Sequence, residues 1–176
     1  MLFRSDLLEQ VADADLLFLA RPNAPTGNCY PIEEMKDICR GFDGPVLIDE
    51  AYVDFADDSG IALPREFPNA IVSRTLSKSY SLAGLRLGFA VAQPDVIFGM
   101  MKVKDSYNIN RVSQALGAAA LRDQDHLQQT VANIRTTRRQ LAAALTDRGF
   151  DVVPSQANFL FAKPPMPAKD YFDQLK

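Results

Sequence analysis

The first half of the chain alternates short, continuously apolar runs with longer amphipathic segments, and this alternation restricts the fold more than any other feature. It is typical of an α/β protein with a parallel sheet. Strands that lack polar alternation are expected where helices cover both faces of a sheet. The candidate strands are Leu16–Ala20, Val46–Ile48, Ala70–Ser73 and Leu87–Ala92.

The remaining segments predict helices and a second unit. A helix is expected over Pro31–Arg40, with Pro31 at its first helical position, and Gly41–Pro45 then leads into the next strand. Apolar residues at three- and four-residue intervals predict a long helix over Asp125–Arg148, stopped by Gly149. The other expected elements are a helix over Val112–Leu121, strands over Asp151–Val153 and Phe159–Ala162, a turn over 163–167 and a helix from Ala168.

This order predicts two domains. Residues 1–148 would form a partial large domain with its connecting helix, and residues 149–176 the start of a small α+β domain. Two short strands and a few helical residues bury little apolar surface alone. Met1 leads almost directly into a strand of the buried type. We therefore expect the chain to be a fragment of a longer protein.

Composition excludes several function classes. The chain has 176 residues, 47% hydrophobic and 23% charged, as in a globular protein. Its net charge of −3 gives no support to nucleic-acid binding. Two cysteines and one histidine favour neither a metal site nor a disulfide scaffold. Acidic residues interrupt each apolar run near the N-terminus, and no run approaches the roughly 20 residues that span a bilayer. A cytoplasmic location without membrane contact is expected.

Polar segments follow three of the four candidate strands. They are residues 21–27 (RPNAPTG), 49–52 (DEAY) and 74–80 (RTLSKSY). Ligands of open α/β sheets bind beyond the carboxyl ends of the strands. If the three strands are parallel neighbours, these segments converge on one cleft.

Each feature alone has an ordinary structural explanation. A single lysine is most often a solvated surface residue, and an aspartate after a strand is most often a cap or a turn former. Pro-Thr-Gly is a turn by itself. Together, however, they supply what pyridoxal-phosphate catalysis requires: a lysine for the cofactor aldehyde, an acid for its ring nitrogen and a phosphate site. The candidates are Lys78, Asp49, Tyr52 for the phenolic oxygen, and Thr75, Ser77 and Arg86 for the phosphate.

The segment SRTLSKSYSLAGLRLGFA (73–90) resembles the cofactor-lysine signature of the fold-type I, class I and II aminotransferases. DEAY (49–52) and PNAPTG (22–27) precede it in that family's order. Within the family, YNINRVSQ (107–114) and SQANFL (155–160) are similar to segments of histidinol-phosphate aminotransferases. The resemblance covers nearly the whole chain.

The resemblance implies roles for individual residues. Lys78 would hold pyridoxal 5'-phosphate and move the substrate proton, and Tyr107 would line the substrate pocket. Ala24 stands where the family has an asparagine, so Asn23, one position earlier, is the candidate for that contact. The other implied cofactor contacts are Asp49, Tyr52, Thr75, Ser77 and Arg86.

The resemblance also implies a reaction and an assembly. Nitrogen would pass from an amino donor to the cofactor and then to a 2-oxo acid, with histidinol phosphate and 2-oxoglutarate as the expected pair, in a homodimer. The family's upstream aromatic and phosphate-binding segment and its downstream carboxylate-binding arginine have no counterpart here, so activity of this chain alone is left open.

Three alternatives compete with this interpretation. An aromatic amino-acid aminotransferase or a phospho-amino-acid decarboxylase would share most of these motifs. A non-catalytic remnant would account for the expected truncation and for Ala24. A nucleotide-binding Rossmann domain is disfavoured because no Gly-x-Gly-x-x-Gly follows the first strand.

Overall fold

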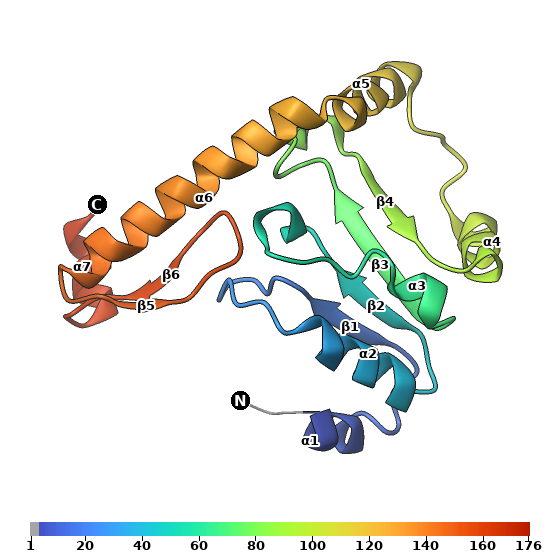
Figure 1. The fold of residues 1–176 in the computed structure, drawn as a ribbon, viewed down its shortest axis with the longest axis horizontal. Coiled ribbons are helices and arrows are strands. Elements are labelled where there is room, and N and C mark those ends of the chain that lie inside the picture. Colours follow the sequence, from blue (N-terminus) through green and yellow to red (C-terminus); the bar gives the residue numbers. More distant parts are fainter. Residues whose placement is uncertain (1–3) are drawn as a thin grey trace.

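A four-stranded sheet in the order β1-β2-β3-β4 forms the centre of the protein, whose computed structural model describes residues 4–176 (Figure 1). Strands β1, β2 and β3 run parallel, and β4 pairs antiparallel with β3. The predicted α/β fold with a mostly parallel sheet is therefore confirmed. The strands are β1 Leu17–Ala20, β2 Val46–Asp49, β3 Ala70–Thr75 and β4 Gly88–Val91.

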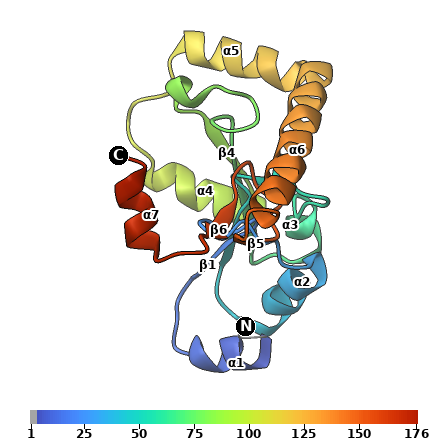
Figure 2. The same ribbon diagram turned by 90° about the vertical axis from the view of Figure 1, so that its left-hand side faces the viewer.

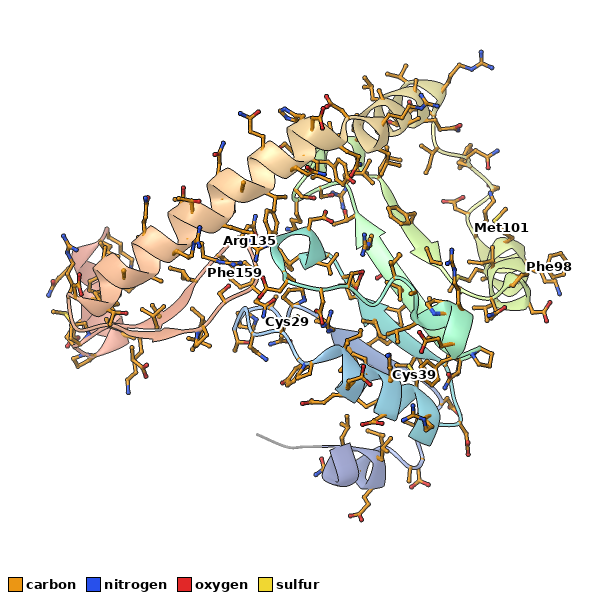
Figure 3. All side chains as sticks on the ribbon, in the orientation of Figure 1. Cys29, Cys39, Phe98, Met101, Arg135 and Phe159 are labelled. Carbon is orange, nitrogen blue, oxygen red and sulfur yellow. The ribbon has the colours of Figure 1, made fainter. Side chains whose placement is uncertain are left out.

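One face of this sheet is covered by α2 (Ile32–Gly41). Val46, Ile48 and Val72 are fully buried against it. Cys39 points from α2 into this layer (Figure 3), and burial raises the pKa of its thiol to about 11. Phe18 on the opposite face of β1 is 68% exposed. The expectation that helices cover both faces is thus wrong for this part of the described sheet.

Asn69 joins the end of α2 to the start of β3. Its amide nitrogen Nδ2 donates to three backbone oxygens that follow or end the helix, at 2.9 Å from Cys39 O, 2.8 Å from Phe42 O and 3.2 Å from Gly44 O. The last carbonyls of a helix lack partners within the helix. One side chain therefore satisfies this turn and fixes it beside the sheet.

Several helices were not predicted. Helix α1 precedes β1, where a direct entry into the strand was expected, and its Leu7 and Leu8 pack against the core. Pro31 is the N-cap of α2 and not its first helical residue. The other unpredicted elements are η1 Val53–Phe55, α3 Leu63–Glu66, η2 Ala83–Leu85 and α4 Pro94–Val103, and α1 itself spans Arg4–Gln10.

The second half begins with two helices that are each capped by a side chain. Asn110 Oδ1 accepts from Ser113 N at 2.8 Å, and Asp123 Oδ1 accepts from His126 N at 3.2 Å. These contacts satisfy free amides at the helix starts. Figure 2 shows α5 and α1 at opposite ends of the molecule. The two capped helices are α5 Arg111–Arg122 and α6 Gln124–Thr146.

Helix α6 leads to an antiparallel strand pair and a last helix (Figure 1). Gly149 has φ 82° just after α6, which agrees with the predicted stop. The second strand starts at Phe161 and not at Phe159, because residues 154–160 form a turn in which Ser155 Oγ donates to Phe159 O at 2.7 Å. The elements are β5 Asp151–Val153, β6 Phe161–Lys163 and α7 Ala168–Gln174. None of the helices within residues 4–176 is both long and apolar enough to cross a membrane.

The turn at 154–160 folds back onto the carboxyl ends of the sheet strands. Gln156 N donates to Gly27 O at 2.7 Å, and the Gln156 side chain accepts from Asp57 N at 2.9 Å. Gly27 has φ 79°, and a Cβ there would lie 2.4 Å from Ser155 Oγ. Only glycine fits this close approach without a shift of the turn.

Candidate active site

The carboxyl ends of β1, β2 and β3 lie side by side. Their register aligns Ala20 with Asp49 and Asp49 with Ser73. The Asp49 carboxylate accepts through Oδ1 from Ala51 N at 3.1 Å and from Ser73 Oγ at 3.3 Å. No described residue hydrogen-bonds its Oδ2. The predicted convergence of three polar segments is confirmed, and Asp49 presents one free carboxylate oxygen there.

Lys78 and Tyr52 meet at this edge. Lys78 follows β3 and is half-buried, and its Nζ lies 5.0 Å from the centroid of the Tyr52 ring. Phe159, from the turn at 154–160, packs edge-on against the same ring with centroids 5.0 Å apart. Within residues 4–176, Lys78 Nζ has neither an ion pair nor a hydrogen bond. The Lys78 amine therefore lies beside the Tyr52 ring and is not paired with a carboxylate.

Two hydroxyl groups lie between Lys78 and the end of β3. Thr75 Oγ1 lies 2.9 Å from Ser77 Oγ and 3.2 Å from Leu87 O, and it accepts from Ser77 N at 3.1 Å. The buried Ser79 is hydrogen-bonded to Asp54. These contacts fix the loop on both sides of Lys78.

The side chains of Arg86 and Asn23 are each engaged within their own segment of the chain. Arg86 adopts φ 52°, and its exposed side chain donates from Nη1 to Ala83 O at 3.1 Å. It directly precedes Leu87, whose carbonyl contacts Thr75. The Asn23 amide donates to Thr26 Oγ1 at 2.6 Å, within its own turn. Neither side chain contacts Lys78, Asp49 or Tyr52 in the described chain.

Tyr107 is separate from the other candidates. It is 87% exposed, on the connection between α4 and α5. Its backbone amide lies near Asp105, and no described residue joins its ring to the other predicted site residues. The structure thus brings together Asp49, Tyr52, Thr75, Ser77 and Lys78, and leaves Arg86, Asn23 and Tyr107 outside this group.

A cluster of ion pairs, which the sequence did not predict, lies at the same strand ends and is centred on the buried Arg21 and Glu50. Glu50 is 1% exposed, and its Oε2 accepts from Arg74 Nε at 3.0 Å and Nη2 at 2.8 Å. It also accepts from Ser59 Oγ at 3.2 Å and from Gly60 N. Arg21 Nη1 lies 3.8 Å from Glu50 Oε1, and its Nη2 pairs with Asp58. We call Arg21, Glu50, Asp58, Ser59, Gly60 and Arg74 the strand-end cluster.

The strand-end cluster ties together the strands that carry the candidate site. Arg21 follows β1, Glu50 follows β2 and Arg74 belongs to β3. Charged side chains are almost never fully buried unless they are paired. The available sequence signal was the presence of opposite charges at three consecutive strand ends.

Comparison with known proteins identifies the family. The model of the family "Aminotransferase class I and II" matches residues 4–175. The chain belongs to this family. A histidinol-phosphate aminotransferase of Syntrophotalea carbinolica is 49% identical over 150 residues, which cover 85% of this chain and 43% of the relative. Another from Citrifermentans bemidjiense is 45% identical, covering 93% of this chain and 47% of the relative.

Solved structures agree with this assignment. The crystal structure of histidinol-phosphate aminotransferase from Sinorhizobium meliloti in complex with pyridoxal-5'-phosphate has a TM-score of 0.86 and 30% identity, over 94% of this chain and 47% of that one. A decarboxylase from Sulfurospirillum multivorans has a TM-score of 0.83 and 25% identity, over 97% of this chain and 52% of that one. The chain spans less than half the length of the two curated relatives above.

Proposed function

We propose that this chain carries the cofactor-lysine part of a pyridoxal-phosphate-dependent aminotransferase. The whole protein would transfer the amino group of histidinol phosphate to 2-oxoglutarate. The observation that carries the proposal is the meeting of the free Lys78 amine, the Tyr52 phenol and the Asp49 carboxylate at one sheet edge. The 45–49% identity to curated histidinol-phosphate aminotransferases supports this amino donor.

The donor set fits pyridoxal phosphate. An amine, a carboxylate with a free oxygen, a phenol and a pair of hydroxyls lie on one edge, which matches the groups that bind an aldehyde, a ring nitrogen, a phenolic oxygen and a phosphate. When bound, the cofactor supplies a conjugated ring that withdraws electrons from the substrate α-carbon. The proposed phosphate contacts are Thr75, Ser77 and Arg86, and the exposed guanidinium of Arg86 has to turn away from Ala83 O to reach them.

The protein's own groups then move and hold protons. Lys78 Nζ would take the proton from the substrate α-carbon and later return one, which is general base and general acid catalysis by one amine. The Asp49 carboxylate would hold a proton on the ring nitrogen, because a carboxylate stabilises a neighbouring positive charge. The Tyr52 hydroxyl would donate to the phenolic oxygen. Phe159 keeps the Tyr52 ring in place through its edge contact.

Further assignments belong to the same proposal. Asn23 is the candidate for an additional contact to the phenolic oxygen, and Tyr107 for the substrate pocket. We propose a large domain over residues 1–148 and the start of a small domain over 149–176. We also propose a homodimeric whole protein that acts in the cytoplasm on a small amino donor and a 2-oxo acid.

A trapping experiment tests the cofactor part of the proposal. The purified chain is mixed with pyridoxal phosphate and reduced with borohydride, and the labelled peptide is located by mass mapping. We expect label on Lys78, its loss in Lys78→Ala, and full labelling in the exposed control Lys102→Ala. Label spread over many lysines, or equal label in Lys78→Ala, would refute the assignment.

A second experiment tests the amino donor. The absorbance change of the bound cofactor is followed in a single turnover with histidinol phosphate, tyrosine or threonine phosphate. The fastest change is expected with histidinol phosphate. A faster change with tyrosine would favour an aromatic amino-acid aminotransferase, and carbon dioxide released from threonine phosphate would favour a decarboxylase.

A further inference from the structure

Helix α6, the turn at 154–160 and Asp57 line an open cavity of about 580 Å³. Its wall includes Arg135, Arg138 and Arg139 from the helix and Ser155 and Gln156 from the turn. None of its lining residues is among the seven candidate cofactor residues. The cavity is therefore a separate feature of the chain.

The three arginines of this wall face the cavity together because they are spaced by three and four residues along one helix. Arg135 pairs with Asp57, and Figure 3 shows it on the side of α6 that faces Phe159. Arg138 Nη1 donates to Phe55 O at 3.2 Å and to Ala157 O at 2.7 Å. Among the described residues, Arg139 has only a long contact of 3.4 Å, to Thr136 Oγ1.

Positive charge exceeds negative charge in this wall. Asp57 is the one carboxylate among the described lining residues, against three guanidinium groups. Partial burial, and then the neighbouring Arg135, lower the pKa of Arg138. Arginines on a solvated helix face repel each other weakly because water screens them. Here the turn at 154–160 forms the opposite wall of an open cavity, so the three guanidinium groups face one shared space.

A neutral donor completes this wall. Gln156 Oε1 accepts from Asp57 N at 2.9 Å, so the Nε2 group of Gln156 is the part of this side chain that can donate to a ligand. Guanidinium groups bind phosphate through parallel N–H donors, and these charge-assisted bonds are stronger than neutral ones. Three guanidinium groups against one carboxylate give this lining a net charge of +2, which is opposite to that of a phosphate dianion.

We propose that this cavity binds a phosphate group, either as free phosphate or as a small phosphate monoester, between Arg135, Arg139 and Gln156. The bound anion joins α6 to the turn at 154–160. Because Phe159 of that turn packs on Tyr52, occupancy also steadies the wall of the candidate active site. This inference concerns a second site and does not depend on the proposed reaction.

The test is calorimetric titration of the whole chain with inorganic phosphate in the absence of pyridoxal phosphate. Arg139→Gln and Arg135→Gln are expected to weaken binding about tenfold each, the equivalent of about 1.4 kcal/mol. Arg122→Gln is the matched control, since it removes the same charge from an exposed helix position outside the cavity, and binding should be unchanged. Equal loss in all three variants would show non-specific attraction and overturn the proposal.

A fourth variant separates this cavity from the candidate cofactor site. If Arg86→Gln abolishes phosphate binding while Arg139→Gln leaves it intact, the anion belongs beside Thr75 and Ser77 and the proposal is wrong. Absence of saturable binding to the unaltered chain would also overturn it. Glycerol 3-phosphate distinguishes the sources: tighter binding than phosphate identifies a monoester ligand, and equal binding identifies the free anion. Circular dichroism melts confirm that each variant is folded.

Discussion

The strand-end cluster and the segment from Arg86 to Asn110 are parts of one chain that differ in how they are held. Every member of the first group contacts another member, and Glu50 is buried with four donors. The second segment contains α4, which has no buried residue, and Tyr107, which is almost fully exposed. We call residues 86–110 the peripheral segment.

The difference between these regions separates two kinds of candidate site residue. Asp49, Tyr52, Thr75, Ser77 and Lys78 sit on or beside the strands that the cluster ties together. Arg86 and Tyr107 belong to the peripheral segment. A site held on rigid elements keeps its geometry before a ligand arrives. The five residues at the strand ends are therefore preorganised. Arg86 and Tyr107 need further contacts to fix the positions of their side chains.

The largest effect is expected from Glu50→Gln, which removes one charge from the strand-end cluster and keeps the side-chain size. Removal of one partner from a buried ion pair costs about 3–5 kcal/mol, because the remaining charges stay buried without compensation. Urea unfolding should show this loss. Glu9→Gln, on the exposed side of α1, is the control and should change little. A loss below about 1 kcal/mol for Glu50→Gln would show that the cluster does not hold the strand ends.

A smaller effect is expected from alkaline pH through Cys39. The folded pKa of about 11 lies above the ordinary value of 9.0, so the unfolded thiol loses its proton first. Stability is thus fully present below pH 9 and falls as pH rises toward 11, by about 3 kcal/mol. Unfolding at several pH values checks this. In Cys39→Ala the same decline should be weaker, and an unchanged decline would contradict the assignment.

Asn69→Ala is expected to cost about 1–2 kcal/mol, because carbonyl oxygens after α2 lose their shared donor. Thermal unfolding monitored by circular dichroism measures it. Asn133→Ala, on an exposed face of α6, is the matched control and should leave the stability unchanged or slightly raised. If both variants change the free energy of unfolding equally, the Asn69 contacts do not stabilise the sheet.

The smallest changes in stability are expected in the peripheral segment. Arg86→Gln and Phe98→Ser should alter the free energy of unfolding by less than about 0.5 kcal/mol, because both side chains are exposed. Phe98→Ser should however lower self-association, since Phe98 is an exposed apolar side chain, as are Met101 and Val103 of the same helix. Sedimentation velocity checks this against Phe172→Ser on α7. A monodisperse, stably folded monomer in the unaltered chain would contradict the expectation of association.

The sequence predicted the parallel strands and the convergence of the candidate site for one physical reason. Continuous apolar runs require burial, and the polar residues directly after them have to gather where parallel strands end. Asp49 and Lys78 follow from that rule together with the family signature. The antiparallel direction of β4 does not follow from that rule, because the apolar pattern of Leu87–Ala92 is the same whichever way the strand runs.

The strand-end cluster could not be predicted from residue types. Arg21, Glu50 and Arg74 are residue types typical of protein surfaces, and only their pairing across three strands explains the burial of Arg21 and Glu50. The sequence also could not predict where the side chains of Arg86 and Tyr107 point, because a family resemblance assigns a role to a residue and not a direction to its side chain. Helix α4 was missed because residues 96–101 contain no polar side chain, so the segment shows no helical periodicity.

The contact between the turn at 154–160 and the sheet has a consequence for the order of folding. Asp57 N and the Gln156 side chain are 99 residues apart in sequence. Contacts of such separation form late, because a long loop has to close before they are made. The ribosome releases the sheet first, so Gly27 O and Asp57 N stay hydrated until the turn arrives. Exchange of the Asp57 amide with solvent therefore reports the last step of assembly, when Phe159 reaches Tyr52.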